Sequence, residues 1–369
     1  MRPYKSCLIS LIASIFTLLL VSNVSAEEVL FSIEPGKIPY LNEGKILASW
    51  NPKGRPETQS ESLKIYFHGK AEGCSPDAKN GLVEKYTKGG ETCYFPSIDR
   101  KFCEPKIKTD NLCSFTCFNG GIKLRTGSGI GNEGLPCFIN TRDAEGVGVG
   151  VDAYNLGNFV NFKLPDGKIK LDKYKKFKII VQSSVEKISL NPTPREKPIQ
   201  LHQKITIGFQ NQYCIQEKKD KKSLCNVKYL LLQFVKRVSA KPHEWRNRVW
   251  FDQGQGGLPI ISVFYNDPNL VTFCGDTLKH EPFKEAIFCY EISWEQFLMG
   301  LKSIASKHYN KPIESITPSD LISIFGTQYG NPSAWYLAVV SFSHEIHDPY
   351  KDYNNYIEGK LKKITVLYK

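Results

Sequence analysis

Residues 199–209 read Ile199-Gln200-Leu201-His202-Gln203-Lys204-Ile205-Thr206-Ile207-Gly208-Phe209. Between Gln203 and Phe209 the stretch has a period of two, with Ile205, Ile207 and Phe209 on one side and Lys204, Thr206 and Gly208 on the other. Successive side chains of a β-strand point to opposite faces, so this alternation indicates a strand with one face in a core.

Segments of similar character recur along the chain and are separated by turn residues. They lie at residues 29–33, 46–50, 63–68, 147–151, 159–164, 176–181, 229–238, 248–251, 260–265, 270–273, 287–292, 335–343 and 361–368. Helical patterns between the early strands are missing, which argues against a doubly wound α/β fold. The sequence therefore predicts a mostly β protein, an antiparallel β-sandwich of the jelly-roll kind.

Two short helices are expected within this β pattern. Ser293-Trp294-Glu295-Gln296 has the form of a capping box and precedes an apolar stripe that runs from Phe297 to Ala305. Thr317 is a second expected N-cap, with Pro318 in the first helical position and Gly326 at the end. We expect both helices to pack onto a sheet.

Residues 1–26 have the organisation of a secretory signal peptide. Arg2 and Lys5 precede an uncharged apolar stretch at residues 7–22, and Val24-Ser25-Ala26 offers small residues for cleavage. The apolar stretch is short for a retained membrane anchor. No later stretch is apolar enough for a membrane span, so we expect a secreted or periplasmic mature protein.

Export makes disulfides plausible, and removal of Cys7 with the signal leaves ten of the 11 cysteines. The expected disulfide cysteines are Cys74, Cys93, Cys103, Cys113, Cys117, Cys137, Cys214, Cys225, Cys274 and Cys289. The simplest pairing joins Cys214 to Cys225 and Cys274 to Cys289, while the pairing of the six earlier cysteines stays open. Cys113 and Cys117 have ligand-like spacing, but no partner motif accompanies them, so no metal site is expected.

Composition divides the mature chain near residue 146. Residues 27–146 are rich in Cys, Gly, Pro, Asp and Asn, which predicts a disulfide-rich β/loop region, and residues 147–369 carry the sandwich pattern. The glycine cluster at residues 127–134 lacks the ending of a phosphate-binding loop and a following helix. No nucleotide or other cofactor is therefore expected.

The chain is basic, with a formal net charge of +12, and an anionic partner is one interpretation of this charge. The signal holds two of the 49 Lys and Arg residues and none of the 37 Asp and Glu residues, so the mature chain carries +10. A lysine-rich but otherwise ordinary surface is the alternative. We expect no nucleic-acid partner; the sequence does not indicate the oligomeric state.

The densest group of polar and aromatic residues lies at residues 245–257. Sugar rings stack on flat aromatic side chains, and amides, carboxylates and guanidinium groups pair with their hydroxyls. On a strand, Arg248, Trp250 and Asp252 would share one face. The predicted substrate-binding residues are Trp245, Arg248, Trp250, Asp252 and Gln253.

Two further stretches carry weaker signals. In Ser343-His344-Glu345-Ile346-His347-Asp348, a strand would place His344 and Ile346 on one face and Glu345 and His347 on the other, as a metal or acid/base pair. Gln200 and His202 would likewise share a face, and a polysaccharide lyase needs such an amide and a base. Ordinary polar strand surfaces are the alternative in both cases.

The C-terminal part resembles concanavalin-like jelly rolls, the sandwich shared by lectins and several polysaccharide-active enzymes. The resemblance rests on Trp335-Tyr336-Leu337-Ala338-Val339-Val340-Ser341-Phe342-Ser343-His344-Glu345-Ile346 and on Gly359-Lys360-Leu361-Lys362-Lys363-Ile364-Thr365-Val366. It covers residues 147–369 and implies the fold and a carbohydrate ligand. The catalytic signatures of the glucanase and alginate-lyase branches are missing, so it assigns no catalytic residue.

The sequence thus leads to an exported polysaccharide-binding protein that either only binds its glycan or also degrades it. An enzyme of this kind would be a polysaccharide lyase or a glycoside hydrolase. The alternative is a secreted surface-interaction or virulence-type protein that binds a protein or an anionic membrane.

Overall fold

The computed structural model describes residues 28–33, 47–49, 63–68, 83–88, 91–96, 115–118, 121–127, 154–162, 164, 168–172, 175–189, 200–216, 230–237, 247–252, 257–264, 266–275, 285–348 and 356–368. The expected signal peptide at residues 1–26 and the expected strand at residues 147–151 lie outside these ranges. So do Trp245 and Gln253.

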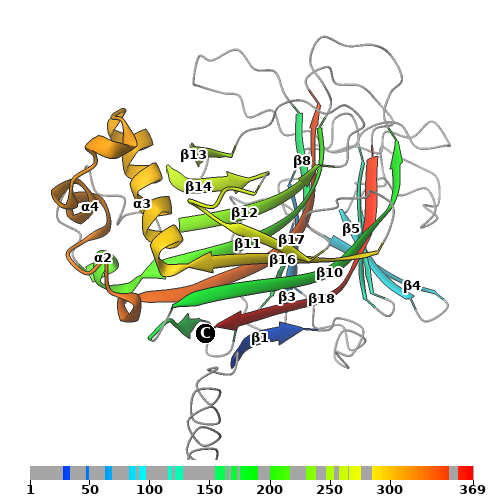
Figure 1. The fold of residues 1–369 in the computed structure, drawn as a ribbon. Helices are drawn as coiled ribbons and strands as arrows, with labels where there is room; N and C mark the ends of the chain where they lie inside the picture. The colour runs from blue at the N-terminus through cyan, green and yellow to red at the C-terminus, as the bar shows by residue number, and fades with distance from the viewer. Residues whose placement is uncertain are drawn as a thin grey trace, which may run out of the picture.

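The described residues form two sheets of nine strands each (Figure 1). The first, called the β10 sheet, has the order β15-β16-β10-β18-β7-β6-β5-β4, with β1 also paired to β18. Its strands are β1 Glu28–Ile33, β4 Val83–Lys88, β5 Glu91–Pro96, β6 Phe115–Phe118, β7 Ile122–Gly127, β10 Lys176–Ser189, β15 Thr272–Gly275, β16 Ala286–Ser293 and β18 Tyr356–Tyr368.

The second sheet, called the β11 sheet, has the order β13-β14-β12-β11-β17-β8-β3-β2, with β9 also paired to β17. Its strands are β2 Leu47–Ser49, β3 Leu63–His68, β8 Tyr154–Phe162, β9 Ile169–Lys170, β11 Gln200–Asn211, β12 Leu230–Arg237, β13 Arg248–Asp252, β14 Leu258–Val263 and β17 Trp335–Asp348. Pairing is antiparallel except between β12 and β14 and between β2 and β3.

The predicted mostly β sandwich is therefore confirmed. Strands from residues 27–146 belong to both sheets, since β7 pairs with β18 and β3 pairs with β8. The region expected to be rich in loops thus contributes strands β4 to β7 to the β10 sheet. A domain boundary near residue 146 stays a prediction.

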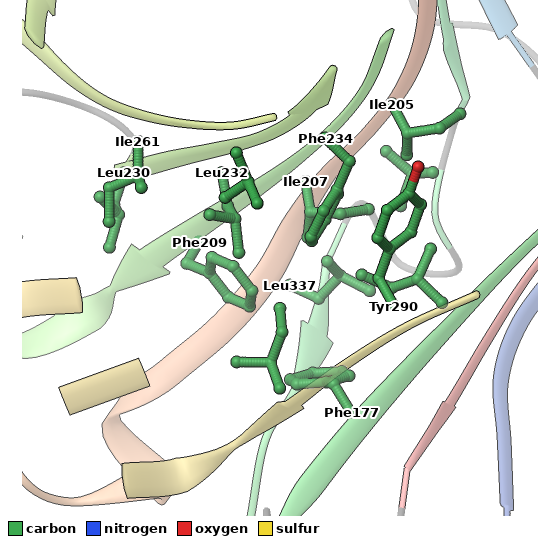
Figure 2. Close-up of a cluster of buried hydrophobic side chains, with 14 of the residues drawn as sticks. Phe177, Ile205, Ile207, Phe209, Leu230, Leu232, Phe234, Ile261, Tyr290 and Leu337 are labelled. Carbon is green, nitrogen blue, oxygen red and sulfur yellow. The ribbon is translucent and has the colours of Figure 1, made fainter. Parts of the chain in front are cut away.

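The core between the sheets consists of the alternating apolar residues that the sequence predicts. Ile205, Ile207 and Phe209 of β11 point to the β10 sheet and pack with Phe177 and Tyr290 (Figure 2). The rings of Phe177 and Phe209 meet edge to face, with centroids 5.9 Å apart. Burial of such side chains contributes about 1.5–3 kcal/mol each and holds the two layers together.

Farther along the sandwich the two sheets also share a polar contact. Ser183 Oγ donates to Gln203 Oε1 at 3.0 Å, and Gln203 Nε2 donates to the Ser184 carbonyl at 3.1 Å. Gln203 Nε2 also lies 3.1 Å from His344 Nε2. Gly359 lies against this contact, and a Cβ there would clash with the Ser184 carbonyl oxygen.

Both predicted helices are present, at the end of the sandwich away from β4 and β5 (Figure 1). In α3 (Trp294–Tyr309), Ser293 Oγ accepts from Gln296 N and Gln296 Oε1 accepts from Ser293 N, which completes the capping box. In α4 (Pro318–Phe325), Thr317 and Asp320 form a second capping box, and Gly326 follows as the C-cap. The described residues also include three short turns of helix: α2 Gln212–Gln216 and the 3₁₀ segments η9 Ile313–Ser315 and η10 Pro332–Ala334.

The disulfide between Cys274 and Cys289 is present and joins β15 to β16. Cys117 is also disulfide-bonded, and Cys214 is disulfide-bonded as well, in a separate bond. None of the helices in the described ranges is long and apolar enough to cross a membrane.

Candidate functional site

The outer face of the β11 sheet, which points away from the core, carries a continuous row of polar residues. Residues directly opposite each other on paired strands point to the same face, so the row follows from the register. Its members are Asn161 of β8, Ser341 of β17, Thr206 of β11, Gln233 of β12, Ser262 of β14 and Arg248 of β13. We call these six residues the polar row.

Each of the central four members is flanked in sequence by large apolar residues that enter the core. Ser262, for example, stands between Ile261 and Val263, and both of these neighbours are buried in the core. The strand period of two therefore puts the polar side chain on the outer face. Thr206, Gln233, Ser262 and Ser341 are nevertheless buried, whereas Arg248 at the edge strand is exposed.

Hydrogen bonds fix one end of the polar row. Trp250 Nε1 donates to Ser262 Oγ at 3.0 Å, and Ser262 Oγ donates to Gln233 Oε1 at 3.3 Å. These two hydrogen bonds orient the half-buried indole ring of Trp250 on the outer face. At the other end, the Ser341 hydroxyl is buried and has no hydrogen-bond partner among the residues that the structure describes.

A charged cluster lies beside the polar row on the same face, and we define it as His202, Lys204, Ser343 and Glu345. Lys204 of β11 stands opposite Ser343 of β17, and His202 stands opposite Glu345. Lys204 Nζ bonds to Glu345 Oε2, with only 6% and 14% of the two side chains exposed. A buried cation beside a carboxylate forms a strong, charge-assisted hydrogen bond.

Phe264 connects the charged cluster to the polar row. Its ring centroid lies 5.8 Å from that of His202 and 5.9 Å from the Arg248 guanidinium carbon. Desolvation lowers the pKa of Arg248 from its ordinary value, but a guanidinium keeps its charge at neutral pH.

The structure thus brings together candidates that are far apart in the sequence. Arg248 and Trp250 lie on the face that carries Glu345 of the second stretch and His202 of the third. As expected, His344 and Ile346 point the other way and are buried between the sheets. Asp252 pairs with Leu258 at the end of β13, but its side chain, like that of His347, lies outside the described residues.

Sequence reasoning missed the polar row itself. The available signal was the recurrence of a single small or polar residue between two large apolar ones, as at Thr206, Gln233, Ser262 and Ser341. Each instance is ordinary for a strand, and only the register aligns the four. Among the described residues no group of three or more His, Cys, Asp or Glu side chains is suited to hold a metal ion.

Comparisons with known proteins add little to this description. No protein-family model and no curated protein matches the chain. Among solved structures, it is similar to the crystal structure of a loop swap mutant of Necallimastix patriciarum Xyn11A, at 9% sequence identity and a TM-score of 0.29. That match covers 83% of this chain and 100% of the other. A similarity at this TM-score carries no argument, so the jelly-roll resemblance of residues 147–369 stays a prediction.

Proposed function

We propose that this protein binds a polysaccharide on the outer face of the β11 sheet, along the polar row. The observation that carries the proposal is the continuity of that row across six paired strands. With neighbouring strands about 4.8 Å apart, six strands span about 24 Å, which suits several linked sugar units lying across the strands. Hydroxyl, amide and guanidinium groups offer both donors and acceptors to sugar hydroxyls.

The aromatic residues support the same ligand class. Trp250 lies at the β13 end of the polar row with its indole N–H tied to Ser262, so its ring is held in place before a ligand arrives. A sugar ring stacks its C–H face on such a surface. The buried Ser341 hydroxyl supports the proposal as well, because a buried polar group without a partner is rare and a sugar hydroxyl would satisfy it.

Cleavage of the bound glycan is the second candidate, and the observation that favours it is Glu345 on the same face. Hydrolysis or elimination needs a group that moves a proton, and Glu345 stands beside His202 and Lys204. In this version the chain is a polysaccharide lyase or a glycoside hydrolase. A hydrolase also requires a second catalytic carboxylate, and Asp252 is the candidate for that role.

The proposal is tested by screening the purified chain on a glycan array, with reducing-sugar and unsaturated-uronate assays in parallel. We expect a glycan that binds the wild type, with binding lost in Trp250→Ala and strongly reduced in Ser341→Ala. Ser303→Ala is the matched control, since the Ser303 hydroxyl bonds to Met299 within α3 and is not part of the face. Absence of any bound glycan, or equal loss in all three variants, contradicts the proposal.

The proposal includes the compartment. We infer that residues 1–26 direct export and are removed, and the Cys274–Cys289 disulfide is compatible with an oxidising environment. N-terminal sequencing of the mature protein from the medium or periplasm tests this, with Glu27 expected as the first residue. Retention of residues 1–26 in a cytoplasmic fraction contradicts it.

A further inference from the structure

The outer face of the β10 sheet is basic, in contrast to the polar row on the opposite side of the sandwich. Register places one set of cationic side chains on this face, where they extend over β7, β10 and β18. The set, called the basic face, consists of Lys123, Arg125, Lys176, Lys178, Lys360, Lys362 and Lys363.

Carboxylates on the same face are fewer and each lies next to a cation. Glu358 contacts Lys123 Nζ at 2.9 Å and Arg125 at 3.6 Å, Glu285 pairs with Lys362, and Glu291 pairs with Lys176. The seven cations of the basic face outnumber these three carboxylates. The face therefore keeps a net positive potential.

Exposed aliphatic side chains lie on the same face. Ile287 of β16 stands opposite Gln182, and Val29 of β1 stands opposite Leu367, which itself stands opposite Lys178. Ile287 is 49% exposed and Val29 is 57% exposed, which makes them the two most exposed large apolar side chains among the described residues. Their position beside lysines is favourable at a boundary between anionic groups and hydrocarbon.

We propose that the basic face docks the protein on a membrane surface that contains anionic lipid. The cations are distributed in two dimensions over several strands, which matches a charged surface better than a single linear polymer. The aliphatic side chains add contacts that a lipid headgroup layer accepts and a soluble polyanion does not. This inference is independent of the proposed glycan site, which lies on the other sheet.

The test measures co-sedimentation of the full chain with two kinds of vesicle, phosphatidylcholine alone and phosphatidylcholine mixed equally with phosphatidylglycerol. We expect binding only to the mixed vesicles, weakening as salt is added. Replacing Lys178, Lys360 and Lys363 with Gln removes three charges, and at about fivefold for each charge we expect binding on the order of 100-fold weaker. Ile287→Ser is expected to weaken it a few-fold.

The matched control replaces Lys168, Lys302 and Lys307 with Gln, three lysines outside this face, and is expected to bind the mixed vesicles within a few-fold of wild type. Thermal unfolding of each variant is compared with that of the wild type to check that the sheet is intact. The proposal is overturned if the mixed vesicles are not bound, or if the two triple variants lose affinity equally. It is also overturned if heparin competes fully and Ile287→Ser has no effect, because a soluble polyanion is then the partner.

Discussion

The outer faces of the two sheets differ in charge, although their inner faces are built from the same kinds of residues. Inside, Phe177 and Ile179 of the β10 sheet meet Ile207 and Phe209 of the β11 sheet. Outside, the β10 sheet presents mainly lysine, whereas the β11 sheet presents the polar row and one buried ion pair.

This difference separates what specifies the fold from what is available for function. Packing of the inner faces constrains every second residue of each strand, because a void or an overpacked site there is costly. The other half of each strand points away from this core. One outer face therefore suits a partner recognised by hydrogen bonding, and the other suits a partner recognised by charge.

The largest predicted effect concerns the inner layer that both faces depend on. Gly359→Ala places a Cβ against the Ser184 carbonyl and 3.1 Å from both Gln203 Nε2 and His344 Cε1. We expect this substitution to lower the free energy of unfolding by about 3 kcal/mol, measured by urea denaturation. Gly330→Ala is the control, since an added Cβ meets nothing within 4 Å there, and an equal loss in both variants would refute this account of the inner layer.

The second prediction compares an ion pair on each outer face. Glu345→Gln leaves Lys204 buried without its carboxylate, and we expect a loss of about 2 kcal/mol in the free energy of unfolding. Glu291→Gln breaks the ion pair between Glu291 and Lys176, whose side chains are 20% and 44% exposed, respectively. Solvent screening reduces the expected loss in the free energy of unfolding to about 0.5 kcal/mol or less. If chemical denaturation shows equal losses of unfolding free energy for the two variants, the buried and the exposed ion pair do not differ as described.

The third prediction separates stability from binding within the polar row. Ser262→Ala removes the acceptor of Trp250 Nε1 and the donor to Gln233, so we expect a loss of about 1–2 kcal/mol in unfolding free energy together with weaker glycan binding. Ser341→Ala deletes a hydroxyl without a partner among the described residues, so stability is expected to stay unchanged or rise while glycan binding falls. Unchanged binding in Ser341→Ala would exclude Ser341 from the site.

The smallest effect is a titration on the basic face. Hydrogen bonds from Lys362 and Gln182 lower the pKa of Glu285 below its ordinary value. A lowered pKa in the folded state stabilises the protein above the ordinary carboxyl pKa, and this contribution is lost as the pH falls through the folded-state value. In Lys362→Met we expect NMR titration to show a higher pKa for Glu285, and an unchanged pKa would mean that Lys362 does not contribute.

Much of the architecture follows from local sequence patterns. The alternation at Ile205, Ile207 and Phe209 predicts the inward face of β11, and the capping boxes at Ser293 and Thr317 predict the starts of α3 and α4. The structure extends β18 beyond the predicted strand, to Tyr356–Tyr368. Strands with a period of two and helices with side-chain caps are recognisable because their causes lie within a few residues.

The candidate site was predictable only in part, because it depends on register. Arg248 and Trp250 were identified from local composition, and Glu345 and His202 were noticed separately. That Glu345 stands opposite His202, and Ser341 opposite Thr206, is set by the pairing of β11 with β17, segments more than a hundred residues apart. A shift of one residue in that pairing would turn the polar side chains inward, and nothing local in the sequence specifies it.

The most direct test of the glycan proposal is side-chain footprinting of the full chain with and without its best array ligand. The account predicts that modification of Trp250 and Phe264 decreases when the glycan binds, while modification of Ile287 on the opposite outer face stays unchanged. Protection of Ile287 with no change at Trp250 would contradict it, because the glycan would then occupy the basic face.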